Sequence, residues 1–354
     1  NLMRIGGFSH IDVLPAIGMD NPVRYRNKAQ YPVSIINGEF VCGFYANHSH
    51  RLIPCEDCLI NLEENKHIIS AIKDFLQACN LTSYDETTHK GFLRHIVIKS
   101  GFHTGEVMVC LVVNAHSFKY KNELITSLSR FDSIKSIAIN YNTDKTNVIM
   151  GQKTETIYGK DTITDIIGNL KFNISPLSFF QVNPIQTEKL YETALDYAGL
   201  TGSETVIDAY CGIGTISLFL AKRAKKVYGV EIIPEAIAAA KENAKLNNIT
   251  NAKFYAGKSE EIIPMLHNEK GITPDVMVVD PPRKGCDESL LKLMLNMSPK
   301  TIVYVSCDSA TLARDLKILC TENYEIKRVQ PVDMFPHTPH VETVVLMSRI
   351  SSNE

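Results

Sequence analysis

The chain has 354 residues, of which 44% are hydrophobic and 21% charged, and its formal net charge is −2. This length exceeds one average domain of about 100–200 residues, and the composition excludes a disordered chain, a collagen-like chain and a small disulfide scaffold. Because the overall charge is nearly balanced, any nucleic-acid binding would have to come from a local patch.

Cysteine usage and the N-terminal residues indicate in which cellular compartment the protein works. The nine cysteines are scattered and odd in number. The sequence contains neither a secretory signal pattern nor a stretch of about 18 apolar residues. We therefore predict a cytoplasmic protein with reduced thiols and no membrane contact.

Strands joined by turns dominate the first half of the chain. Residues 95–99 and 106–113 flank a glycine-containing turn, which predicts a β-hairpin. Further strands are expected at residues 134–141 and 147–150. One helix is expected over residues 62–79, where apolar side chains recur at helical spacing.

Strands and helices alternate after about residue 172. Strands are expected at 205–208, 226–231, 275–280, 301–306 and 344–347, and helices at 214–223, 234–246, 289–296 and 309–319. This alternation predicts βαβ units with a mostly parallel sheet.

The predicted fold class is therefore α/β with two domains. A β-rich α+β central domain should occupy residues 21–171, and a Rossmann-like domain residues 172–354. Residues 1–20 are expected to form an N-terminal helix or linker packed on the Rossmann-like domain.

A glycine turn follows the first strand of the Rossmann-like half, in the motif DAYCGIGT at 208–215. Gly212 and Gly214 would let the backbone approach a ligand closely, because a Cβ would collide. Glu231 ends the next strand about 20 residues on, where a carboxylate can accept hydrogen bonds from ribose hydroxyls. The third glycine of a dinucleotide fingerprint and the P-loop lysine are missing. A nucleoside without a pyrophosphate is therefore favoured over NAD, and a tight turn without a ligand is the alternative.

Asp280 and Cys307 follow two further strands at the same predicted edge. Two prolines after Asp280 end its strand, and the alternative is a solvated turn residue. Cys307 lies between a buried strand and a helix N-terminus, whose dipole should lower the thiol pKa from about 8.5. For a lone cysteine the alternative is a small buried hydrophobe, which we adopt for Cys42, Cys79, Cys110, Cys211 and Cys320.

A proline-fixed loop before the last strand presents His337, His340 and Glu342. The prolines preclude the helical spacing at which two histidines share a metal ion. A carboxylate acid–base site is therefore favoured over a metal site.

Several motifs in one order resemble the RNA uracil-C5-methyltransferase family, which forms 5-methyluridine in ribosomal and transfer RNA. They are SFFQVN at 178–183, DAYCGIG at 208–214, DPPR at 280–283, SCD at 306–308, TLARD at 311–315 and HVE at 340–342. NPVRYRNK at 21–28 resembles the start of the family's central domain.

The resemblance implies S-adenosylmethionine as methyl donor and S-adenosylhomocysteine as product. Cys307 matches the family's nucleophile and Glu342 its proton-abstracting base, although Asp308 and Ser309 stand where many members have Asn and Pro. The predicted donor site comprises Gln181, Tyr210, Glu231 and Asp280, which match family positions, and Gly212, Gly214 and Thr215 of the glycine turn.

Many family members hold an iron–sulfur cluster, and Cys58 matches one of its ligand positions. Residues 1–41 contain no cysteine, so the cluster is not expected in this chain as it stands. The pair Cys55 and Cys58 alone is too little for a zinc site.

RNA contacts are expected from aromatic and basic side chains. Phe180 and Phe335 could stack on bases, with a core position as the alternative. Arg24, Arg26 and Lys28 interleave with Tyr25 and could contact the RNA backbone, unless they form a solvated strand face. Arg283 is a further candidate for substrate contact.

Three other activities compete with this interpretation. An amino-group methyltransferase would need an aromatic ring at position 283, and a cytosine-C5 enzyme would need a cysteine there. A non-catalytic RNA-binding module would not need Cys307. Resemblance to the large-subunit branch favours 23S ribosomal RNA over transfer RNA as substrate, and no protein partner is implied.

Overall fold

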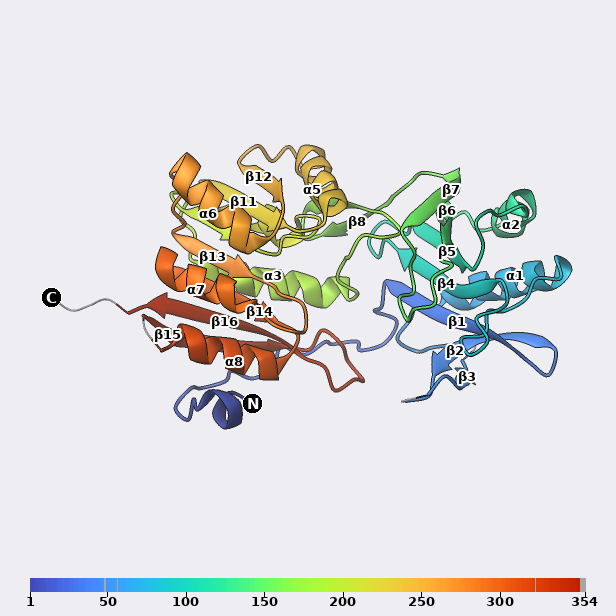
Figure 1. The fold of residues 1–354 in the computed structure, drawn as a ribbon, viewed down its shortest axis with the longest axis horizontal. Helices are drawn as coiled ribbons and strands as arrows, with labels where there is room; N and C mark the ends of the chain where they lie inside the picture. Colours follow the sequence, from blue (N-terminus) through green and yellow to red (C-terminus); the bar gives the residue numbers. More distant parts are fainter. Residues whose placement is uncertain (48, 56, 322, 351–354) are drawn as a thin grey trace. The chain divides into compact units, whose positions relative to one another are not determined.

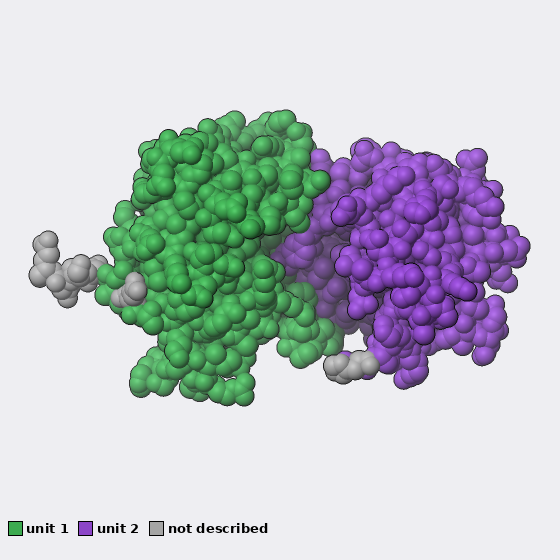
Figure 2. Space-filling model, in the orientation of Figure 1, with its two compact units in different colours: residues 1–20, 167–172, 185–354 green, residues 21–166, 173–184 purple. Residues whose placement is uncertain are grey.

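The computed structural model describes residues 1–47, 49–55, 57–321 and 323–350. The chain divides into two compact units, coloured separately in Figure 2. The α/β unit comprises Asn1–Asp20, Ile167–Phe172 and Ile185–Glu354, and the central unit comprises Asn21–Ile166 and Asn173–Pro184.

The predicted boundary after residue 171 is wrong in detail. Strands β8 (Ile163–Ile167) and β9 (Leu170–Ile174) form a two-stranded sheet whose residues are divided between the units. Residues 173–184 then return to the central unit. A single boundary cannot describe a chain that passes between the units more than once.

A seven-stranded sheet in the order β12-β11-β10-β13-β14-β16-β15 forms the centre of the α/β unit (Figure 1). Strands β10 to β14 pair in parallel, whereas β16 is antiparallel to both of its neighbours. The mostly parallel sheet is therefore confirmed. The strands are β10 (Thr205–Asp208), β11 (Lys226–Glu231), β12 (Ala252–Ala256), β13 (Val276–Val279), β14 (Thr301–Ser306), β15 (Tyr324–Val332) and β16 (Glu342–Arg349).

Helices alternate with these strands, as the periodicity of the sequence predicts. Strand β13 is buried throughout, as expected for a parallel strand covered on both faces. A short π-helix, η1 (Leu2–Gly6), packs against α8. The helices are α3 (Pro184–Ala198), α4 (Thr215–Ala221), α5 (Pro234–Leu246), α6 (Ser259–Lys270), α7 (Glu288–Met297) and α8 (Ser309–Leu319).

The central unit contains a second seven-stranded sheet, in the order β3-β2-β1-β4-β5-β6-β7. The predicted hairpin is confirmed as β4–β5, and β5 pairs in parallel with β6. Helices α1 (Glu64–Ala78) and α2 (Lys121–Leu128) share one apolar core with the sheet. The strands are β1 (Lys28–Ile36), β2 (Glu39–Tyr45), β3 (Leu52–Pro54), β4 (Leu93–Ser100), β5 (Val107–Val113), β6 (Ile134–Tyr141) and β7 (Lys153–Gly159).

The strand predicted at residues 147–150 is wrong, because side-chain amides take the backbone groups that a sheet would need. The Nδ2 of Asn142 donates to the carbonyls of Val148 and Ile149, at 2.7 and 3.0 Å. Asn140 similarly exchanges hydrogen bonds with the backbone of Gly151. This segment is consequently a loop, and β7 begins after it.

Within the described part of the chain, no helix combines the length and the apolar character that crossing a membrane requires.

Candidate active site

Four predicted site residues meet at one edge of the α/β sheet. Glu231 ends β11, and Asp280 and Cys307 directly follow β13 and β14. Glu342 begins β16, which runs antiparallel to β14 with Ser306 opposite Thr343. The start of β16 therefore lies at the edge where the parallel strands end, next to the crevice between β10 and β13 where α/β sheets bind ligands.

The two glycines of the turn after β10 have different roles. Both are left-handed, with φ of 53° at Gly212 and 87° at Gly214. A Cβ on Gly214 would lie 3.2 Å from Ala240 Cβ and from the Phe254 ring, so this glycine lets α5 and β12 pack closely. A Cβ on Gly212 would enter open space. Of the two predicted ligand-facing glycines, Gly212 is thus the one that borders free volume.

Glu231 ties the glycine turn to the end of β11. Its Oε2 accepts a hydrogen bond from Gly212 N at 3.3 Å, and its Oε1 accepts one from Ile233 N at 3.1 Å. The neighbouring side chains of Ile232 and Ile233 are 59% and 53% exposed. A carboxylate beside open backbone and apolar surface can hold a nucleoside, because its sugar offers hydroxyl donors and its base an apolar face.

Other residues of the DAYCGIGT motif are used inside the protein. Asp208 is fully buried and accepts a hydrogen bond from Ser217 Oγ at 2.6 Å, and burial raises its pKa to about 6. Cys211 is buried, and a Cβ on Gly229 would lie 2.9 Å from its Sγ. Cys211 is therefore a packing residue, as predicted.

Two further side chains of the motif also contact the protein interior. Thr215 contacts Tyr191 through the two hydroxyls, 2.9 Å apart. Tyr210 is half-buried against the apolar core.

The predicted lowering of the Cys307 pKa is wrong. Burial is the largest cause that raises this thiol pKa, to about 11, and the charges of Glu342 and Asp280 raise it further, while Arg283 opposes them. The N-terminus of α8 is instead capped by Asp308, which accepts hydrogen bonds from Ala310 N at 2.9 Å and Thr311 N at 3.0 Å. A carboxylate, not the thiol, therefore benefits from the helix dipole.

Glu342 has the properties of an acid–base group. It is 3% exposed, and its Oε2 has no hydrogen-bond partner among the residues that the structure describes. Burial raises its pKa to about 7, against the opposing charge of Arg283. Burial, together with the charges of Glu342 and Asp208, holds the pKa of Asp280 well above its usual range. A carboxyl group that titrates near neutral pH can exchange a proton with a substrate.

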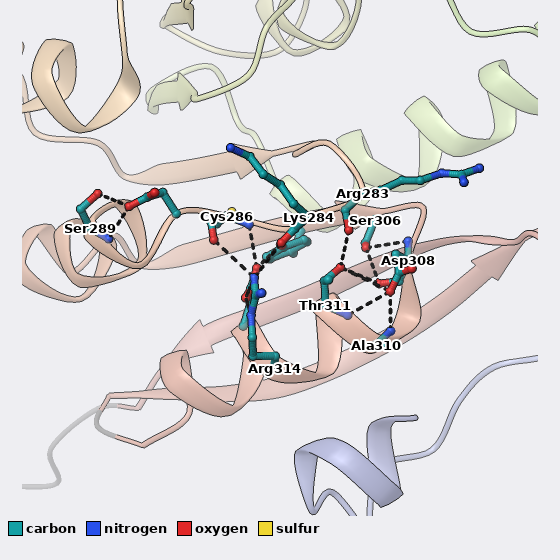
Figure 3. Close-up of polar contacts among 12 residues, drawn as sticks. Arg283, Lys284, Cys286, Ser289, Ser306, Asp308, Ala310, Thr311 and Arg314 are labelled. Atoms are coloured by element: carbon teal, nitrogen blue, oxygen red, sulfur yellow. Dashed lines mark hydrogen bonds and ion pairs between the residues drawn. The ribbon is translucent and has the colours of Figure 1, made fainter. Parts of the chain in front are cut away.

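The loop after β13, residues 281–287, is held by the TLARD motif on α8 (Figure 3). Thr311 Oγ1 donates to the Arg283 carbonyl at 3.1 Å, and Arg314 Nη2 donates to the Lys284 carbonyl at 2.9 Å. Figure 3 shows the side chains of Arg283 and Lys284 extending away from these contacts. The motif thus fixes the backbone that carries Arg283 and leaves its side chain outside the network.

Asp315 lies at the centre of this network and is fully buried. Its Oδ2 accepts hydrogen bonds from Tyr304 Oη at 2.6 Å and Cys286 N at 2.8 Å, and its Oδ1 accepts one from Arg314 Nε at 2.7 Å. A Cβ on Gly285, whose φ is 79°, would lie 2.5 Å from Arg314 Nη2. Sequence reasoning assigned no role to these residues. Their spacing of three and four residues, which places Thr311, Arg314 and Asp315 on one helix face, was the available signal.

The basic segment that opens the central unit differs from the prediction. Tyr25 is 1% exposed and is a core residue, not a stacking platform. The Arg24 guanidinium is engaged with Asp57 at 2.6 and 2.8 Å. Arg26 and Lys28 are half-buried, and burial lowers the pKa of each. The expected alternation of exposed basic and aromatic groups is therefore not present.

Phe180 and Gln181 also belong to the central unit, and both are buried. The backbone carbonyl of Gln181 accepts a hydrogen bond from Asn27 Nδ2 at 3.0 Å. Phe335 in the α/β unit is half-buried and meets His340 edge-on, with ring centroids 6.4 Å apart.

Cys55 and Cys58 are free thiols, and the described residues contain no group of three or more His, Cys, Asp or Glu placed to hold a metal.

The sheet topology and the ligand edge define a Rossmann-like methyltransferase fold joined to a β-rich unit. A family model described as tRNA (uracil-5-)-methyltransferase matches residues 145–350. A protein of Clostridium acetobutylicum named an uncharacterized RNA methyltransferase is 56% identical over 99% of this chain and 76% of its own length. A protein of Bacillus cereus, also named an uncharacterized RNA methyltransferase, is 53% identical over 99% of this chain and 76% of its own length. The chain therefore belongs to the tRNA (uracil-5-)-methyltransferase family.

A solved structure supports the same assignment. The Pyrococcus abyssi tRNA (uracil-54, C5)-methyltransferase, in complex with S-adenosyl-L-homocysteine, is 29% identical with a TM-score of 0.79. The match covers 98% of this chain and 80% of that one. The predicted fold class and the predicted resemblance to RNA uracil-C5-methyltransferases are both confirmed.

Proposed function

We propose that this RNA methyltransferase modifies carbon 5 of uridines through a covalent adduct with Cys307, using S-adenosylmethionine and releasing S-adenosylhomocysteine. One observation carries the proposal: a half-buried thiol and the buried carboxyl of Glu342, whose Oε2 has no hydrogen-bond partner among the described residues, lie at the ligand edge of the sheet. Methylation of an amino group would need neither a nucleophilic sulfur nor a base beside it.

The α/β unit offers groups that fit the methyl donor. Gly212 borders open space, Glu231 presents a fixed carboxylate, and Ile232 adds exposed apolar surface. When bound, S-adenosylmethionine supplies an electrophilic methyl group. The relative from Pyrococcus abyssi was solved with the demethylated product. Tyr210 and, from the SFFQVN motif, Gln181 are further donor contacts that we propose from the family pattern, and Thr215 is one that we propose from the glycine turn.

Carbon 5 of uracil is a poor nucleophile until a second bond forms to the ring. The sulfur of Cys307 adds to carbon 6, and the electron pair of the ring double bond moves toward the carbonyl oxygen, which makes carbon 5 nucleophilic. The thiol is protonated at neutral pH, because its pKa is about 11. Its proton therefore passes to solvent as the sulfur adds to carbon 6, because the thiol is only half-buried.

Glu342 completes the cycle. After carbon 5 has taken the methyl group, Glu342, which is partly ionised because its pKa is about 7, takes the proton from that carbon, the double bond re-forms, and the sulfur leaves carbon 6. Burial and the neighbouring carboxyl charges raise the pKa of Asp280 well above its usual range, which favours its protonated form. It can therefore donate a hydrogen bond to the oxygen on which negative charge develops.

RNA containing 5-fluorouracil tests this chemistry. Fluorine replaces the proton that Glu342 would remove, so the wild-type protein with S-adenosylmethionine should form a stable covalent adduct. Cys307→Ala should form none, and an adduct in that variant would contradict the assignment. Glu342→Gln should accumulate the adduct with ordinary RNA, and unimpaired turnover would remove Glu342 from the mechanism.

We favour 23S ribosomal RNA as the substrate because the motifs resemble the large-subunit branch of the family. Transfer RNA is the second candidate, because the relative from Pyrococcus abyssi is a tRNA (uracil-54, C5)-methyltransferase. Incubating the protein with unmodified transcripts of each RNA and mapping 5-methyluridine distinguishes them. Methylation of the transfer RNA alone would reject the ribosomal assignment.

A further inference from the structure

A cavity of about 360 Å³ lies within the central unit, and none of its lining residues is used in the chemistry above. Its walls come from β1, β2, β4 and the loop before β7, and include Phe44, Tyr45, His50, Glu86, Arg94 and His95. The volume is at the lower end of the range of about 300–1,000 Å³ that is typical of small-ligand sites.

An irregularity in β4 directs two consecutive polar side chains to this cavity. The pairing of β4 with β5 shifts register between Leu93 and His95. Successive residues of a regular strand point to opposite faces, whereas a bulge can turn neighbours toward one side. Arg94 and His95 both line the cavity as a result.

These two side chains have unused hydrogen-bonding atoms. Arg94 and His95 are 4% and 6% exposed, and Arg94 Nε and His95 Nδ1 have no partner among the described residues. Arg94 is held in place by its other nitrogens, which donate to the carbonyls of Asn142, Asp144 and Thr146 at 2.7–3.0 Å. Buried polar atoms are normally paired, so the two cavity-lining residues that carry these atoms are candidates for contact with a ligand.

Aromatic rings form the outer part of the cavity. Phe44 and Tyr45 are 39% and 38% exposed, and both belong to strand β2. Tyr45 is supported by the edge of His50, with ring centroids 6.1 Å apart. Exposed, fixed aromatic rings are surfaces on which unstacked bases of RNA pack.

The carboxylate of Glu86 makes the cavity less favourable for a simple anion than for a neutral ligand. The carboxylate of Glu86, paired with His50, lines the cavity and would repel a phosphate. His95 is neutral at pH 7, because burial lowers its pKa to about 4, so its ring offers both a donor and an acceptor. Donors, acceptors and flat apolar walls together match the edge and faces of a nucleobase.

We propose that this cavity binds one unpaired base of the RNA substrate, other than the uridine that reacts at Cys307. The lining residues all belong to the central unit, whereas Cys307 belongs to the α/β unit. The inference rests on the proposed function, since it takes RNA as the ligand.

Methylation kinetics with the 23S ribosomal RNA or transfer RNA transcript that the wild-type protein modifies test the proposal. Tyr45→Ala and His95→Asn should each raise KM for the transcript, with kcat and the Kd for S-adenosylhomocysteine unchanged. For Tyr45→Ala the expected rise is about 5- to 150-fold, the usual range for one stacked base. Tyr45→Phe keeps the ring and should behave as wild type.

Tyr158→Ala is the matched control, because Tyr158 is an aromatic residue of the same unit, 42% exposed and outside the cavity lining. Equal KM values for wild type, Tyr45→Ala and His95→Asn would overturn the proposal, as would an equal rise in Tyr158→Ala. Absence of methylation by the wild-type protein on every RNA would instead reject the proposed function. Ultraviolet crosslinking of the transcript to Tyr45, mapped by mass spectrometry, should identify the bound base.

Discussion

Removing the Asp315 carboxylate should destabilise the α/β unit strongly and release the loop that carries Arg283. In Asp315→Ala, Cys286 N and Tyr304 Oη lose a buried acceptor that lies 2.8 and 2.6 Å away. Each buried donor left unsatisfied costs about 1–3 kcal/mol. The Arg314 side chain is 49% exposed, so solvent screens its ion pair and the pair itself contributes about 0–1 kcal/mol.

The expected loss in the free energy of unfolding is therefore about 2–6 kcal/mol for Asp315→Ala, the sum for two buried donors left without an acceptor. Arg314→Ala should cost about 1 kcal/mol, because the Asp315 carboxylate keeps its hydrogen bonds from Tyr304 Oη and Cys286 N and the lost ion pair is screened by solvent. The two variants should differ in stability because Asp315 is the buried member of the pair and Arg314 the half-exposed one.

Urea unfolding followed by far-ultraviolet circular dichroism provides the measurement, which suits a chain without tryptophan. Tyr304→Phe is the control, because it removes one of the two donors without leaving a cavity. In that background Asp315→Ala should cost less than it does alone, since one unsatisfied hydroxyl is gone. A loss below about 1 kcal/mol for Asp315→Ala, or a loss equal to that of Arg314→Ala, would refute the reasoning.

Three further predictions concern the ligand edge. The folded-state pKa of Glu342, about 7 against a usual 4.5, means that the native state binds more protons between these values, so the urea midpoint should fall as pH rises through this window. Glu342→Gln should flatten that dependence, and an unchanged slope would contradict the raised pKa. Alkylation of Cys307 by iodoacetamide should accelerate up to about pH 11, whereas a plateau near pH 8.5 would indicate an unperturbed thiol. Gly214→Ala should lower stability by about 1–3 kcal/mol through overpacking, whereas Gly212→Ala should mainly weaken binding of S-adenosylhomocysteine in a calorimetric titration.

Much of the α/β unit could be predicted from local patterns. The strands at residues 205–208, 226–231 and 301–306 and the helices at 234–246 and 309–319 were predicted with the bounds that the structure shows. Apolar periodicity and capping residues act over a few positions, so the chain itself carries this information. The loop at residues 147–150 was mistaken for a strand, because the amides of Asn140 and Asn142 that hold it come from a neighbouring segment.

The amino-acid pattern was sufficient to predict a glycine turn, a strand-end carboxylate, a cysteine and a late glutamate as one site, in the motif order of one family. It could not determine that β16 inserts antiparallel beside β14, which is what brings Glu342 to the edge that holds Cys307. Nor could it determine the direction of the thiol pKa shift, which follows from burial and from the surrounding carboxyl groups. Strand order, desolvation and unpaired atoms such as His95 Nδ1 depend on contacts between residues far apart in the chain, and only the tertiary structure decides those.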